Sequence, residues 1–157
     1  MQIFFPKEEG PETRATILPE VAKKFIDLGI DVVVETQIGS KIFNSDEMYN
    51  LVGAKISSDR LVSNAEADIV CRINKPNKEE IASLKKGSIH ISFLDPFNES
   101  ELVNEFASSQ ITAISMELVP RITRAQKMDA LSSQANLGGY SAVIEASKTL
   151  LKSFPMM

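Results

Sequence analysis

The chain has 157 residues, 43% of them hydrophobic and 24% charged, which suits one globular domain and excludes a disordered chain. Seventeen Lys and Arg against 21 Asp and Glu give a net charge of −4, which argues against a general nucleic-acid binder. One cysteine excludes an internal disulfide, and one histidine excludes a two-histidine metal motif, so we expect no metal site. We also expect neither a signal peptide nor a membrane span.

Five short runs rich in β-branched and aromatic residues predict strands. They are Gln2–Phe5, Ile30–Glu35, Asp68–Ile73, Ser88–Leu94 and Ile111–Met116. Helical patterns lie between them. They are Glu20–Leu28, a short helix capped by Ser45-Asp46 and ending near Leu51, Lys78–Leu84, and Glu99–Ala107 capped by Asn98.

This alternation predicts an α/β fold: a three-layer, flavodoxin-like domain with a mostly parallel sheet. After Met116 the pattern changes, because residues 120–130 are polar and basic without a sustained apolar face. From Ser132 onward the sequence predicts one long helix with many small residues, which continues until Pro155 stops it. We therefore expect a domain over residues 1–131 and a connecting helix over residues 132–157.

Charged side chains follow the predicted strands. In open α/β sheets ligands bind beyond the carboxyl ends of the strands, where Lys7, Lys75, Asp95 and the nearby Arg14 would lie. This mixed charge suits a polar or anionic small ligand, although solvated loop charges would give the same pattern. The seven glycines form no G-x-G-x-x-G motif and no P-loop, so the chain has no glycine-rich phosphate cradle of its own.

The densest polar stretch is the segment 121–133. Arg121, Gln126 and Asp129 supply a planar donor, an amide and a carboxylate, which together could bind a carboxamide and ribose hydroxyls. A local Arg–Asp ion pair is the plainer alternative. For His90, which shares a strand face with two serines, a hydrogen-bonded structural role is favoured over a catalytic one. Cys71 lies within an apolar strand and is interpreted as an unreactive thiol.

Several motifs resemble the alanine dehydrogenase/transhydrogenase N-terminal domain family, and within it the alpha subunit of proton-translocating NAD(P) transhydrogenases. The resemblance spans essentially the whole chain and is most specific between Met116 and Asn136. The segments that carry it are Glu12–Ala15, Pro19–Val21, Ala67–Val70, Leu84–Gly87, Ser92–Leu94, Met116–Gln126 and Met128–Asn136.

The resemblance implies that the chain is the N-terminal portion of an NAD(H)-binding component, inactive when isolated. The whole component would take part in hydride transfer between NADH and NADP⁺, coupled to proton translocation by partner subunits. Implied partners are an absent Rossmann domain, an NADP(H)-binding subunit, membrane subunits and a second copy in a homodimer. The chain would be soluble and lie at the cytoplasmic face of the inner membrane.

Residue roles also follow from the resemblance. Arg121 and Asp129 would hold the nicotinamide end of NAD(H), with Ser132 and Ser133 close by, and Gln126 would reach toward NADP(H) on the partner. Arg14 and Lys75 match positions that hold a substrate carboxylate in the alanine dehydrogenase branch.

One departure distinguishes the branches, because Asp95 stands where that branch has a catalytic histidine. Two alternatives to the transhydrogenase interpretation remain. The chain could be a fragment of an alanine dehydrogenase-like enzyme, or a non-catalytic remnant or assembly module.

Overall fold

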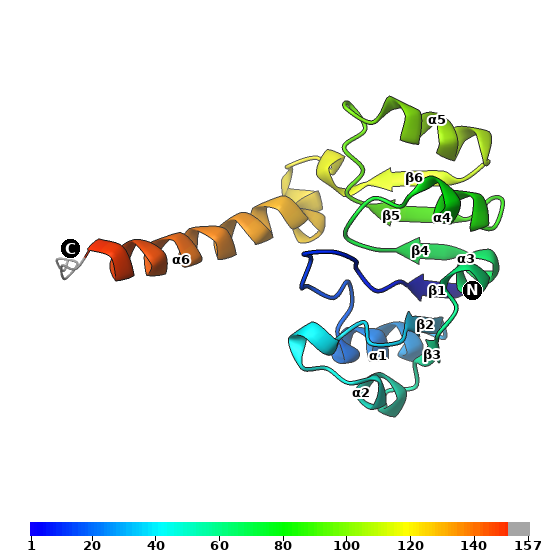
Figure 1. The fold of residues 1–157 in the computed structure, drawn as a ribbon, viewed down its shortest axis with the longest axis horizontal. Helices are drawn as coiled ribbons and strands as arrows, with labels where there is room; N and C mark the ends of the chain where they lie inside the picture. The colour runs from blue at the N-terminus through cyan, green and yellow to red at the C-terminus, as the bar shows by residue number, and fades with distance from the viewer. Residues whose placement is uncertain (151–157) are drawn as a thin grey trace. The chain divides into compact units, whose positions relative to one another are not determined.

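The computed structural model of the chain describes residues 1–150, so the predicted helix stop at Pro155 lies outside it. Six strands, all parallel, form one sheet in the order β3-β2-β1-β4-β5-β6 (Figure 1). The strands are β1 (Gln2–Phe5), β2 (Asp31–Glu35), β3 (Lys55–Ser57), β4 (Ile69–Cys71), β5 (Ile89–Ser92) and β6 (Thr112–Ser115).

The predicted α/β class is confirmed. The five predicted strands occur in the order β2-β1-β4-β5-β6, which is the flavodoxin-like order, and β3 adds a sixth strand beside β2. The chain therefore reverses its direction of travel across the sheet between β1 and β4. This switch point is where doubly wound sheets open a crevice for ligands.

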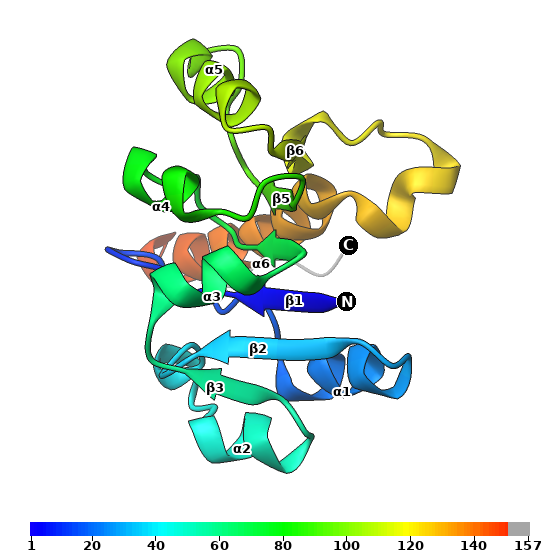
Figure 2. The same ribbon diagram turned by 90° about the vertical axis from the view of Figure 1, so that its right-hand side faces the viewer.

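Helices connect the strands and lie on both faces of the sheet (Figures 1 and 2). They are α1 (Pro19–Asp27), α2 (Asp46–Leu51), α3 (Arg60–Glu66), α4 (Lys78–Ser83), α5 (Ser100–Ser108) and α6 (Ala130–Leu150). Short 3₁₀ segments occur at Ser40–Ile42, Met116–Leu118 and Thr123–Met128. The sequence analysis missed β3 and α3.

Two predicted helix caps are wrong. Ser45 occupies the position before α2, but its side chain makes no capping hydrogen bond. Asn98 does not cap the fifth helix, because its amide donates to both carboxylate oxygens of Asp95 (2.9 and 3.1 Å) and α5 begins at Ser100.

Alternate residues of each central strand face opposite sides of the sheet, and each side has its own core. In β1, Phe4 packs with Val70, Ile81 and Phe106 on the side of α4 and α5. Its neighbours Ile3 and Phe5 belong to the other core, which is completed by α1 and α2. Because β1 is buried on both faces, it fixes the loop that follows it, and this loop forms one wall of the candidate site.

The chain divides into two compact units, Met1–Ser115 and Met116–Met157. The first contains the sheet with α1 to α5, and the second contains the polar segment and α6. Within residues 1–150, no helix is both long enough and apolar enough to cross a bilayer.

Candidate functional site

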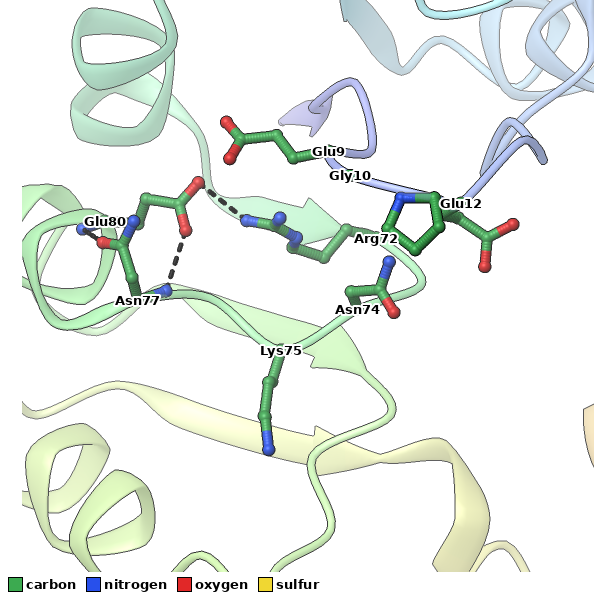
Figure 3. Close-up of a pocket in the computed structure, with 9 residues that line it drawn as sticks. Glu9, Gly10, Glu12, Arg72, Asn74, Lys75, Asn77 and Glu80 are labelled. Atoms are coloured by element: carbon green, nitrogen blue, oxygen red, sulfur yellow. Dashed lines mark hydrogen bonds and ion pairs between the residues drawn. The ribbon is translucent and has the colours of Figure 1, made fainter. Parts of the chain in front are cut away.

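A pocket of about 670 Å³ lies at the switch point of the first unit (Figure 3). One wall is the loop after β1, and the other is the loop between β4 and α4. The lining residues are Glu9, Gly10, Pro11, Glu12, Arg72, Asn74, Lys75, Asn77 and Glu80. The pocket is therefore polar and carries both signs of charge, as the charges at the strand ends predicted.

The buried carboxylate of Glu8 joins the two walls. Its Oε1 accepts a hydrogen bond from the backbone N–H of Ile73 (2.5 Å), and its Oε2 accepts from the backbone N–H (3.2 Å) and the side-chain amide (2.9 Å) of Asn74. The Thr16 hydroxyl donates to Oε1 at 3.2 Å. Glu8 is only 4% exposed, so this carboxylate is a structural fastening for the pocket.

Behind the pocket, two arginines share one carboxylate. Glu80 Oε1 accepts from Arg72 Nη1 and from Arg60 Nη1, both at 2.8 Å, and its Oε2 accepts from the backbone N–H of Asn77 at 2.8 Å (Figure 3). Burial alone would raise the pKa of Glu80, but the Asn77 N–H and the two guanidinium groups outweigh it and lower the pKa. Arg60 also pairs with Glu35 at 2.8 Å. The arginines are therefore neutralised within the fold.

Of the four charges predicted at the strand ends, only Lys75 lines this pocket, and its ammonium is paired with Glu99. Arg14 forms a two-point pair with Glu12, from Nε to Oε1 (2.9 Å) and from Nη2 to Oε2 (2.6 Å). This contact lowers the pKa of Glu12 to about 2. Lys7 donates to the Gln37 side chain, and Asp95 accepts from Asn98. Sequence reasoning missed Glu8, Arg72 and Glu80, because charged residues are usually solvated.

The second unit holds a smaller pocket of about 300 Å³. It is lined by Arg121, Ile122, Thr123, Gln126, Asp129 and Ser132. Five of the predicted site residues fall in this segment, and four of them line this one pocket. Ser133 does not line it, and its hydroxyl donates to the Asp129 backbone carbonyl at 3.1 Å. No ion pair joins Arg121 to Asp129 in the portion of the chain that the structure describes.

Asp129 also caps α6. The residue precedes the helix, and its Oδ1 accepts from the Ser132 backbone N–H at 3.0 Å while its Oδ2 accepts from the Ser132 hydroxyl at 2.5 Å. These two bonds hold the pKa of the Asp129 carboxyl below its usual value. The carboxylate is therefore ionised at neutral pH, and each oxygen keeps a further lone pair for a ligand donor.

His90 and Cys71 have structural environments. His90 is 1% exposed, its Nε2 lies 3.1 Å from the Ser92 hydroxyl, and burial lowers its pKa to about 3. The predicted hydrogen-bonded structural histidine is confirmed. Burial raises the pKa of Cys71 to about 11, so the thiol stays protonated. Residues 1–150 contain no cluster of three or more His, Cys, Asp or Glu that could hold a metal ion.

Comparison with known proteins identifies close relatives. The family model described as alanine dehydrogenase/PNT, N-terminal domain, matches residues 4–138. In two relatives, NAD(P) transhydrogenase subunit alpha is divided, and this chain matches the first portion of it. That portion is 45% identical to the whole chain in Rickettsia prowazekii and 39% identical in Rhodospirillum rubrum. A crystal structure of transhydrogenase from Sinorhizobium meliloti is 39% identical and superposes on the whole chain with a TM-score of 0.90.

Alanine dehydrogenases are more distant. Alanine dehydrogenase 1 of Staphylococcus aureus is 32% identical over 86% of the chain, and an L-alanine dehydrogenase structure covers 76% of it with a TM-score of 0.71. The chain spans 42% of each of the two alpha-subunit proteins from Rickettsia prowazekii and Rhodospirillum rubrum, and 47% of the transhydrogenase chain in the crystal structure.

Proposed function

The chain belongs to the alanine dehydrogenase/PNT N-terminal domain family, and on that basis we propose that it is the N-terminal portion of the NAD(H)-binding component of a proton-translocating NAD(P) transhydrogenase. The observation that carries this proposal is the match of the whole chain, in sequence and in fold, to transhydrogenase alpha subunits. The alanine dehydrogenases match only a portion of it.

The donors and acceptors of the second unit support a role in binding the nicotinamide end of NAD(H). A guanidinium, an amide, a carboxylate and a hydroxyl line one pocket, and this set is complementary to a carboxamide and to ribose hydroxyls. In the proposal, Arg121 and Asp129 hold that end, and Ser132 fixes the Asp129 carboxylate in place. Gln126 reaches toward NADP(H) on the partner subunit.

Direct hydride transfer needs the two rings held at about 3–3.5 Å, and it needs no protein acid or base. The contribution of this chain is therefore positioning. The pocket fits that task, because Ala125 is buried and the backbone N–H of Asp129 donates to the Gln126 carbonyl, which gives the segment a fixed path. Phosphate binding falls to another domain in this proposal, since no glycine-rich motif occurs in the chain.

The proposal extends to partners and location. The alpha-subunit relatives are longer than this chain, and we assign the remainder to a Rossmann domain that follows the connecting helix predicted over residues 132–157. The assembly would be completed by an NADP(H)-binding subunit, by membrane subunits and by a second copy of the component. It would stand on the cytoplasmic face of the inner membrane.

Reconstitution tests the proposal. The full chain is combined with the portion of the Rickettsia prowazekii protein that it does not match, together with membranes carrying the partner subunits of that relative. We expect hydride transfer from NADH to NADP⁺, followed by absorbance, and no oxidation of alanine, because Asp95 occupies the position of the histidine. Pyruvate formation from alanine would overturn the proposal. A complex that assembles without transferring hydride would instead support the non-catalytic alternative.

A further inference from the structure

The loop between β2 and α2 presents an aromatic side chain far outside both pockets described above. Phe43 is 96% exposed, more than any other large hydrophobic side chain among residues 1–150. Its backbone adopts a left-handed conformation with φ of 63°, which is uncommon for a residue other than glycine. A fully solvated phenylalanine in a soluble domain gains nothing for folding, so its placement calls for another explanation.

The loop that carries Phe43 is firmly held. Asp46 Oδ2 accepts from the Thr36 hydroxyl at 2.6 Å, and Asp46 Oδ1 accepts from the Gln37 backbone N–H at 2.7 Å. The Gly39 carbonyl accepts from the Asn44 backbone N–H at 3.0 Å. A Cβ on Gly39 would lie 2.6 Å from the Asn44 carbonyl oxygen, so the turn is closely packed. A partner that binds the ring therefore loses little loop entropy.

A pocket of about 460 Å³ lies beside the ring. It is lined by Gln37, Ser40, Phe43, Asn44, Ser45, Asp46 and Glu47. The lining thus holds two carboxylates, two amides and two hydroxyls, and none of its members is basic. The Ser45 hydroxyl lowers the pKa of the Glu47 carboxyl, which is therefore ionised at neutral pH.

The two nearby lysines are engaged elsewhere. Lys41 Nζ donates to the backbone carbonyls of Gly10 (3.0 Å) and Glu12 (2.8 Å), and Lys7 Nζ donates to Gln37 Oε1 (3.2 Å). The pocket therefore combines an exposed aromatic face with an acidic rim. A phosphate would be repelled by the Asp46 and Glu47 carboxylates, whereas a cation would be attracted.

We propose that this pocket is a docking site for an arginine side chain presented by a partner protein. A guanidinium is planar, stacks on an aromatic face and donates in a fixed fork to a carboxylate, so Phe43 and Glu47 together are complementary to it. Fixed aromatic anchors paired with arginine are typical of interface hot spots. The inference is independent of nucleotide binding and goes beyond the proposed function.

The full chain, labelled with ¹⁵N, is titrated with the tripeptide acetyl-Gly-Arg-Gly-amide and followed by amide chemical shifts. We expect saturable shifts confined to residues 37–47, and a dissociation constant at least about fivefold higher in Phe43→Ala and in Glu47→Gln. The matched control is Phe97→Ala, since Phe97 is 83% exposed in a different loop and should leave the affinity unchanged. The same tripeptide with citrulline in place of arginine should bind at least about fivefold more weakly.

Three further outcomes would overturn the proposal. Free arginine binding more tightly than the tripeptide would make the pocket a metabolite site, because its α-carboxylate should be repelled by the acidic rim. AMP shifting the same residues at lower concentration would make it a site for a nucleotide base. Sedimentation velocity that finds a dimer in the wild-type chain but not in Phe43→Ala would mean that a second copy covers the ring.

Discussion

Ser132 donates two hydrogen bonds to Asp129, from its backbone N–H to Oδ1 at 3.0 Å and from its hydroxyl to Oδ2 at 2.5 Å. The carboxylate that the sequence pattern assigned to a ligand is thus also the N-cap of α6. One side chain sets both the start of the helix and the wall of a pocket. A change at Asp129 should therefore alter local structure as well as binding, and the two effects need separate measurements.

Asp129→Ala should fray the first turn of α6, because the backbone N–H of Ser132 loses its acceptor. Amide hydrogen exchange would then be faster over residues 130–133 and unchanged in the sheet. Asp129→Asn keeps one acceptor oxygen and should retain most of the protection. Equal exchange in the alanine variant and the wild type would show that the cap does not hold this turn.

Glu8→Ala should lower the free energy of unfolding by about 3 kcal/mol, because two backbone N–H groups and the Asn74 amide lose a buried acceptor. Urea denaturation measures the change. Glu79→Ala is the matched control, since Glu79 is an exposed glutamate in the first turn of α4 and should change stability little. Equal stability of the two variants would mean that water replaces the carboxylate without cost.

Gly39→Ala should destabilise the first unit by about 2 kcal/mol, because a Cβ at this position would lie 2.6 Å from the Asn44 carbonyl oxygen and 3.0 Å from the Tyr49 hydroxyl. Gly138→Ala is the contrasting variant. Gly138 lies in the interior of α6 with nothing within 4 Å of a Cβ, so alanine should favour the helix by about 1 kcal/mol. Thermal unfolding of both variants, with the same sign of change in each, would contradict the steric argument.

His90 should make the fold less stable in acid. Its pKa is lowered to about 3 in the folded chain, against about 6.5 when unfolded, so only the unfolded state binds a proton as the pH falls between these values. From about pH 7.5 to 5.5 this linkage removes about 1.4 kcal/mol of stability. His90→Gln lacks the titrating group, and its unfolding free energy should fall by that much less over the same range. Parallel pH profiles would place the proton elsewhere.

The central strands were predictable because their residues have one dominant role. Val32 to Val34 are buried on both faces, and a run of β-branched residues is the pattern such a strand requires. β3 was missed because Lys55–Ser57 contains one apolar residue among three. The edge strand is stabilised by pairing with β2 rather than by a hydrophobic pattern, and local sequence does not report that pairing.

The candidate site was predictable only where its residues lie close together in the sequence. Arg121, Gln126 and Asp129 fall within nine positions, so a motif could place them in one pocket. The sharing of Glu80 by Arg60 and Arg72 joins residues 20 and eight positions apart through the packing of α3, α4 and β4. Nothing in the local sequence distinguishes this buried carboxylate from its exposed neighbour Glu79.

In the reconstituted assembly, Gln126→Ala should slow hydride transfer while leaving the NADH dissociation constant nearly unchanged. In the proposed function, Gln126 aligns the two rings, and a misplacement of about 1 Å can cost about 100-fold in rate. Arg121→Ala should instead weaken NADH binding as well, because a lost ground-state contact appears in the binding constant. Stopped-flow transfer rates and NADH titrations separate the two effects.

Ser132→Ala serves as the control for this pair, since it removes the hydroxyl bond to Asp129 and leaves the backbone N–H bond that caps α6. Its effect on NADH affinity should be smaller than that of Arg121→Ala, because the carboxylate stays in place and loses only one of its two anchors. If Gln126→Ala raised the NADH dissociation constant as much as Arg121→Ala, with normal transfer between bound nucleotides, Gln126 would be an NAD(H) ligand. The segment would then bind one nucleotide rather than align two.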